Sequence, residues 1–113
     1  MNICVVTILV TCYCLPVRII ALKTLRGFWE AHPDVRQPLQ AWFEDAKHAK
    51  WPSPAHIKAI YCNASIIANN RVVFNIKGND YRLIVAVNYR LSIAYIRFIG
   101  KHSEYDRIDA TQI

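Results

Sequence analysis

The stretch that decides the fold is RVVFNIKGNDYRLIVAVNYRLSIAYIRFIG, residues 71–100. Apolar and polar residues alternate most regularly over 81–89, and a period of two is typical of a β-strand. Short polar stretches at 77–80 and 90–91 interrupt the pattern and predict tight turns. Together with the turn-forming pair Asn69-Asn70, they predict an antiparallel meander. The expected strands cover residues 65–68, 71–76, 81–89 and 92–99.

The residues before this stretch have helical spacing instead. Apolar residues recur three or four apart over 22–32, and Pro33 is expected to end that helix. Pro38 is expected to begin a second helix, and the serine-proline pair at 53–54 a third. A short apolar opening at 18–21 favours a strand. The order predicts an α+β fold with an N-terminal strand and helices packed on one face of a twisted antiparallel sheet. The core is expected to include Trp29, Trp42 and Trp51.

The charge is positive and unevenly distributed. Fourteen Lys and Arg against eight Asp and Glu give a net charge of +6 in 113 residues, with 54% apolar residues, which indicates one globular domain. Residues 47–101 hold nine of these cations and one anion, Asp80. Such an excess favours an acidic partner such as nucleic acid or anionic lipid, and a merely solvated basic face is the alternative.

The N-terminal segment 1–16 differs from the rest. Residues 3–15 are uncharged and apolar, but a membrane-spanning helix needs about 20 residues. We interpret the segment as an extension included by an error in the gene start, with a GTG codon at Val17 as the true start; a signal or anchor and an extra strand are the alternatives. It holds three of the four cysteines, and the remaining Cys62 is expected to be a small buried residue. A body without a disulfide favours the cytoplasm.

Basic side chains on neighbouring strands suggest a phosphate-binding face. Alternation places Arg71 and Asn75 on one side of their strand, and Arg82 opposite the row of apolar residues on the next. Arg97 lies in an apolar run, where an unpaired charge is costly. Guanidinium groups on one face, with Lys77 at its rim, suit a phosphate backbone. The alternative is a structural ion pair of Arg97, and the residues alone do not decide between the two. The acidic partners for that pair are Glu104, Asp106 or a C-terminal carboxylate.

One histidine stands apart from the others. His102 follows the end of the last expected strand, and histidine is a common general acid or base, although a lone histidine is more often structural. The chain has no nucleotide-binding loop, zinc-protease motif or serine-hydrolase motif. The residues by themselves therefore indicate a basic α+β domain that binds RNA or phosphate.

Two blocks, F-N-x-x-G-N-x-x-R at 74–82 and I-R-x-x-x-x-H-x-E-Y-D at 96–106, resemble the HigB family of toxins from type II toxin-antitoxin systems. The similarity covers 17–113 as one toxin domain, and 1–16 has no place in it. It implies a RelE-like fold and an endoribonuclease that cleaves mRNA on the ribosome and arrests translation. No metal or cofactor is implied, because the 2′-hydroxyl of the RNA attacks the adjacent phosphate. It also implies a HigA-type helix-turn-helix antitoxin, through which the complex would bind operator DNA, and no membrane.

The resemblance also implies roles for single residues. Arg82 and Arg97 would clamp the scissile phosphate, and His102 would be the general acid or base. Tyr105 would be an alternative proton donor or a base-stacking platform, and Asp106 would orient His102 or Arg97. The remaining expected RNA contacts are Arg71, Asn75, Lys77, Asn79 and Lys101, and for Asn75 and Asn79 a turn-stabilising role is the alternative. Two alternatives stay open: a non-catalytic RNA-binding module, and a membrane-associated protein if the N-terminal segment acts as an anchor.

Overall fold

The computed structural model describes residues 16–78 and 80–113. The N-terminal extension lies outside the described residues apart from Pro16, and so does Asn79 of the expected RNA contacts. The described elements follow in the order β1 (Arg18–Ile20), α1 (Leu22–Ala31), α2 (Pro33–His48), α3 (Pro54–Ile60), β2 (Ser65–Ile67), β3 (Arg71–Ile76), β4 (Tyr81–Asn88), β5 (Ile93–Lys101) and α4 (His102–Tyr105).

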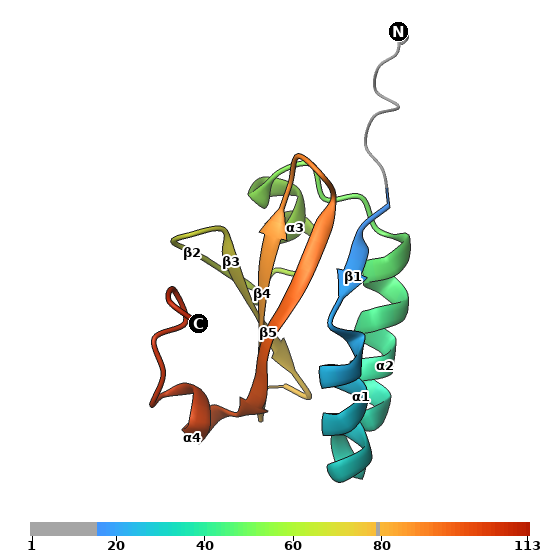
Figure 1. Cartoon of the computed structure of the whole chain (residues 1–113), viewed down its shortest axis with the longest axis vertical. Helices are drawn as coiled ribbons and strands as arrows, with labels where there is room; N and C mark the ends of the chain where they lie inside the picture. The colour runs from blue at the N-terminus through green and yellow to red at the C-terminus, as the bar shows by residue number, and fades with distance from the viewer. Residues whose placement is uncertain (1–15, 79) are drawn as a thin grey trace, which may run out of the picture.

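The strands form one mixed sheet in the order β1-β5-β4-β3-β2 (Figure 1). The four strands β2 to β5 are the predicted antiparallel meander, and β1 adds to its edge parallel to β5. Asn69 and Asn70 have φ angles of 61° and 59°, which confirms the predicted turn between β2 and β3. The prediction of an α+β fold with an N-terminal strand is therefore confirmed.

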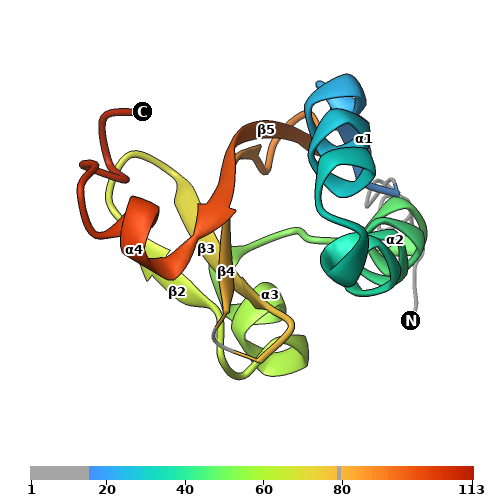
Figure 2. The same ribbon diagram turned by 90° about the horizontal axis from the view of Figure 1, so that it is seen from below.

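Three helices cover one face of this sheet, and the C-terminal segment lies on the other (Figure 2). The second helix begins earlier than predicted, at Pro33 and not at Pro38. Pro33 occupies the first turn, where a missing N–H costs nothing, and Pro38 lies inside the helix. The buried stripe Val35, Leu39 and Trp42 starts before Pro38, so packing against the sheet outweighs the hydrogen bond that Pro38 removes.

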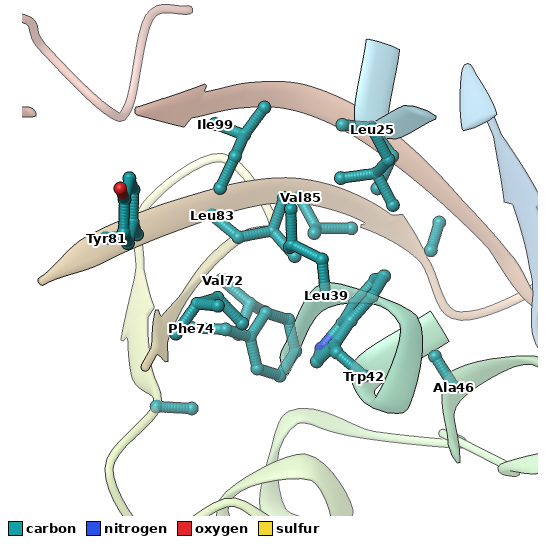
Figure 3. Close-up of a cluster of buried hydrophobic side chains, with 14 of the residues drawn as sticks. Leu25, Leu39, Trp42, Ala46, Val72, Phe74, Tyr81, Leu83, Val85 and Ile99 are labelled. Carbon is teal, nitrogen blue, oxygen red and sulfur yellow. The ribbon is translucent and has the colours of Figure 1, made fainter. Parts of the chain in front are cut away.

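Aliphatic and aromatic side chains together fill the core between the helices and the sheet (Figure 3). The centre of the Phe74 ring on β3 lies 5.3 Å from the ring centre of Trp42 and 5.7 Å from that of Trp51. Trp29 is also buried, so the prediction that the three tryptophans are core residues is confirmed. Cys62 was expected to be buried, but it is exposed, because it lies in the turn that follows α3.

The C-terminal segment 102–113 packs on the sheet face opposite the helices, which we call the outer face. Its apolar residues contact Val73 of β3 and Ile84 of β4, which are paired across the two strands. Arg71 holds the far end of the segment through hydrogen bonds from Nε and Nη2 to the carbonyl oxygen of Ile113, at 3.1 and 2.9 Å. The contacting residues of the segment are Tyr105, Ile108, Ala110 and Ile113. Within the described part of the chain, no helix is both long and apolar enough to cross a membrane.

Candidate catalytic site

One end of the outer face carries the row Asn75, Arg82 and Gly100. The strand register pairs Asn75 of β3 with Arg82 of β4, and Arg82 with Gly100 of β5. The predicted placement of Arg82 opposite the buried row on β4 is therefore confirmed, because Leu83 and Val85 lie in the core. The amide of Asn75 donates to the carbonyl oxygen of Asn63 at 3.2 Å, which fixes that side chain against the turn after α3.

The short helix α4 brings an aromatic ring to Arg82. The Arg82 guanidinium carbon lies 5.7 Å from the centre of the Tyr105 ring. The helix starts at the end of β5, where the Glu104 carboxylate accepts a hydrogen bond from the Lys101 backbone N–H at 2.8 Å. The backbone N–H of His102 donates to the carbonyl oxygen of Asp80 at 3.1 Å. These two bonds fix the direction of α4 and so set where Tyr105 and His102 lie.

His102 and Asp106 form a pair one helical turn apart. Nδ1 of His102 lies 3.1 Å from Oδ2 of Asp106, and both side chains are about half exposed. Asp106 was expected to orient His102 or Arg97, and the structure places it beside His102. A proton on Nδ1 that is donated to the carboxylate leaves Nε2 as the basic ring nitrogen. The pair thus resembles an oriented histidine that is ready to accept or donate a proton.

A hollow of about 390 Å³ lies beside His102 and Lys101, and its charge is mixed. Asp34 and Asp80 contribute carboxylates to its wall. Asp34 accepts hydrogen bonds from the Tyr81 hydroxyl at 2.8 Å and from Lys77 Nζ at 3.1 Å. These bonds, that of Tyr81 foremost, hold the pKa of Asp34 below its usual value. Lys77 is therefore already paired and does not lie free at the rim of a phosphate site.

Arg97 does not lie in the same row as Arg82. The register shifts between Ile84 and Val85, so that Ile84 pairs with Phe98 and Val85 with Ile96, and Arg97 is the extra residue of a β-bulge. Gly100, which pairs with Arg82, is three residues further along β5, or about 10 Å at the usual rise of a strand. The structure therefore separates the two arginines that were expected to clamp one phosphate. Within the described residues, Arg97 forms no ion pair with the acidic residues 104 and 106.

The sequence did not indicate α4 or the course of the C-terminal segment. The helix is only four residues long, too short for a helical period to show in the sequence. The acidic residue three positions after Lys101 was the one available signal, because a glutamate there suits a capping box. Within the described part of the chain, no three His, Cys, Asp or Glu side chains gather as a metal site.

Comparisons with known proteins bear on this arrangement. Residues 35–108, more than half of the chain, match the family model of the HigB toxin, described as the RelE-like toxic component of a toxin-antitoxin system. The chain belongs to the HigB toxin family. The residues of the candidate site on the sheet and on α4, from Asn75 to Asp106, lie within the matched segment, and Asp34 of α2 lies just before it.

Curated relatives agree with the HigB assignment. The mRNA interferase toxin HigB of Escherichia coli (strain K12) is 27% identical over 90 residues, which cover 78% of this chain and 86% of the relative. The mRNA interferase HigB of Shigella flexneri matches with the same identity and coverage. The resemblance to the HigB family, stated from the sequence, is thereby confirmed.

A methyl group at Gly100 is expected to clash with the side chains that pack beside it and so to destabilise the site. A Cβ there would lie 2.6 Å from Cζ of Phe98 and 2.9 Å from Oε1 of Glu104, the residue that caps α4. Overpacking of this kind commonly costs about 1–3 kcal/mol. We expect Gly100→Ala to lower the melting temperature by several degrees. Gly27→Ala, where nothing lies within 4 Å of a Cβ, should not lower the melting temperature, because alanine favours the helix. A melting temperature of Gly100→Ala equal to that of the wild type would contradict the close packing at Gly100.

The Asp34 carboxylate is expected to make stability depend on pH in the acid range. Its pKa is lower in the folded chain than the usual value of about 3.9, so its contribution is present above that value and is lost as the pH falls through the folded pKa. The difference in melting temperature between the wild type and Asp34→Asn should therefore be present near neutrality and shrink below about pH 4. Thermal melts across pH measure it, and a difference that grows on acidification would contradict the ion pair with Lys77.

Proposed function

We propose that this chain is a toxin that cleaves mRNA on the ribosome and so arrests translation. Membership of the HigB family supports the class of activity, and the names of the relatives support mRNA as the substrate. The observation that carries the proposal is the joint placement by α4 of the His102–Asp106 pair and of Tyr105 against Arg82. Residues 17–113 are proposed as the toxin domain, which acts in the cytoplasm where ribosomes are found.

The proposed reaction needs only the RNA and protein side chains. The 2′-oxygen of the nucleotide before the scissile phosphate forms a bond to phosphorus, its proton goes to a base, and the bond from phosphorus to the 5′-oxygen breaks. The leaving 5′-oxygen takes a proton from an acid. The products are a 2′,3′-cyclic phosphate and a 5′-hydroxyl end, so the atoms balance without an external co-reactant or a metal ion.

His102 and Arg82 are the proposed catalytic residues. Nε2 of His102 either takes the proton of the attacking 2′-hydroxyl or gives a proton to the leaving 5′-oxygen, and Asp106 keeps the ring oriented for this transfer. The Arg82 guanidinium is the proposed donor to the phosphorane oxygens, on which negative charge grows in the transition state. Tyr105 holds this guanidinium in place and offers a ring for a base to stack on.

Further residues at this end of the sheet are proposed to contact the RNA without taking part in the chemistry. Lys101 is exposed next to His102 and lines the same hollow, so its charge is available to a phosphate. Asn75 lies in the row with Arg82, and Asn79 remains a proposed contact from the sequence alone. The charge of Lys77 is shared with Asp34, so we propose only a minor contribution from this lysine.

The proposed partner is an antitoxin of the HigA type, a helix-turn-helix protein that would inhibit the toxin and carry the complex to operator DNA. The family is a toxic component of a two-part system, which supports an antitoxin in general. A HigA-type protein is the specific proposal, and the neighbouring reading frame is the place to find it.

Induction of the chain in growing cells tests the proposed function. We expect growth to stop, mRNA to be cut within codons, and the neighbouring gene to restore growth. The Arg82→Ala, His102→Ala double variant is the control and should be harmless. Harmless overproduction of the folded wild type would contradict the toxin function. Growth arrest by the folded double variant would favour instead a non-catalytic RNA-binding module.

A further inference from the structure

A second hollow, and a basic one, lies at the end of the outer face opposite the mixed-charge hollow beside His102. It has a volume of about 410 Å³ and is lined by Arg71, Arg90 and Arg97. No Asp or Glu is among the described residues that line it, whereas the hollow beside His102 contains two carboxylates. Arg71 is already hydrogen-bonded to the main-chain oxygen of Ile113, but Arg90 and Arg97 have no acidic partner among the described residues, so this hollow is the more positive of the two.

The β-bulge directs Arg97 into this hollow. The inserted residue has no partner on β4, and a bulge changes the direction in which its side chain points. The Arg97 guanidinium carbon lies 5.6 Å from the centre of the Tyr95 ring, which also lines the hollow. The side chain is exposed, so its N–H donors are available to a ligand.

Arg71 forms a fixed wall of the hollow. Its Nε and Nη2 donate to the carbonyl oxygen of Ile113, and its Nη1 donates to that of Asn69 at 2.8 Å. Three of the five guanidinium N–H donors are thus used, and among the described residues the other two have no acceptor. A guanidinium that is held in this way loses little conformational entropy when it binds an anion.

Arg90 comes from the turn between β4 and β5, which a side chain stabilises. The carboxamide oxygen of Asn88 accepts a hydrogen bond from the Leu91 backbone N–H at 3.0 Å. Arg90 is exposed in this turn. The hollow is therefore bounded by a fixed arginine on β3, a bulged arginine on β5 and a turn arginine between β4 and β5.

We propose that this hollow binds backbone phosphates of the RNA strand, away from the site of cleavage. The inference rests on the proposed function for the identity of the polymer. Ala86, which lines the hollow, is four residues from Arg82 along β4, or about 13 Å at the usual strand rise. A stacked nucleic acid strand covers that distance in about four nucleotides at ~3.4 Å each. The hollow would thus hold the strand in register while the scissile phosphate lies at Arg82.

The composition of the hollow favours RNA over an acidic protein segment. Arginine forks match phosphate and carboxylate oxygens alike, so the feature that favours RNA is Tyr95, which adds a flat ring on which a base stacks. Backbone contacts of this kind carry no sequence preference, so the hollow contributes affinity and not choice of codon.

Binding of a 12-nucleotide RNA tests the proposal. Every 2′-hydroxyl of the probe is methylated, so that it lacks the attacking group and stays intact with the wild-type chain. Dissociation constants are measured over a range of salt for the wild type and for the Arg90→Gln, Arg97→Gln double variant. We expect the variant to bind at least tenfold more weakly in low salt. The slope of log affinity against log salt should fall by about 1.4, because each phosphate contact to a single strand contributes about 0.7.

The matched control is Arg26→Gln, Arg36→Gln, which removes the same charge from exposed positions on α1 and α2. Its affinity and salt slope should stay close to those of the wild type. Equal weakening in the two double variants would overturn the proposal, since net charge alone would then explain binding. So would wild-type RNA affinity in Arg90→Gln, Arg97→Gln together with lost binding of the antitoxin, because the hollow would then serve a protein.

The outcome is separable from that of the proposed function. If the wild type cleaves RNA but the Arg90→Gln, Arg97→Gln variant binds the probe as tightly, the hollow proposal fails and the catalytic one stands. If the wild type binds the probe through these arginines but cuts no RNA, the hollow proposal stands and the endoribonuclease proposal fails.

Discussion

Arg82→Ala is expected to slow the cleavage of ribosome-bound mRNA about a hundredfold or more at saturating concentrations. Loss of one preorganised donor to a developing oxyanion typically costs about 2.7–4 kcal/mol of transition-state stabilisation. Arg82 is well placed for such a donor because Tyr105 lies against its guanidinium and Asn75 and Gly100 flank it on the neighbouring strands. Single-turnover cleavage rates measure the effect.

Two controls separate chemistry from structure for Arg82. Arg82→Lys keeps the charge but loses the fork, so its rate should lie between those of the wild type and Arg82→Ala. Arg97→Ala removes an arginine from the other end of the outer face and should weaken RNA binding without slowing the saturated rate. A large fall in melting temperature for Arg82→Ala, with activity reduced only in proportion, would instead assign this arginine a structural role.

His102→Gln is expected to slow the same reaction by about 10²–10⁴-fold, the usual contribution of a general acid or base. Glutamine approximates the size of histidine, but its amide neither accepts nor releases a proton near neutral pH. Asp106→Asn should have a smaller effect than His102→Gln, since Asp106 acts only through the orientation of the ring.

The controls for His102 use the other histidines. His48 and His56 are exposed in or near helices far from α4 in the sequence, so His48→Gln and His56→Gln should cleave like the wild type. Equal rates for His102→Gln and these two variants would show that His102 does not transfer a proton, and Tyr105 would become the candidate.

The sequence predicted those parts of the fold that depend on the alternation within neighbouring strands and on the turns between them. The Asn69-Asn70 turn and the facing of Asn75 and Arg82 both follow from the alternation of two neighbouring strands and one turn. It failed at Pro38, because a proline does not mark the start of a helix when the buried stripe begins earlier.

The sequence indicated candidate residues for the site, whose roles stay predictions, but it did not indicate their geometry. Alternation cannot count the extra residue of a bulge, so Arg97 was expected beside Arg82 although the register separates them. The short α4 and the packing of residues 108–113 on the outer face have no periodic signal, because tertiary contacts decide them. The resemblance implied that Asp106 orients His102 or Arg97, and the structure places it beside His102.

The most direct test is the single-turnover cleavage of ribosome-bound mRNA by the Arg82→Ala, His102→Ala double variant, with its melting temperature compared with that of the wild type. The wild type should produce ends with a 2′,3′-cyclic phosphate and a 5′-hydroxyl. The folded double variant should show no cleavage above that of ribosomes alone, because both charge stabilisation and proton transfer are removed. Cleavage at the wild-type rate by a folded double variant would contradict the assignment of the catalytic site to Arg82 and His102.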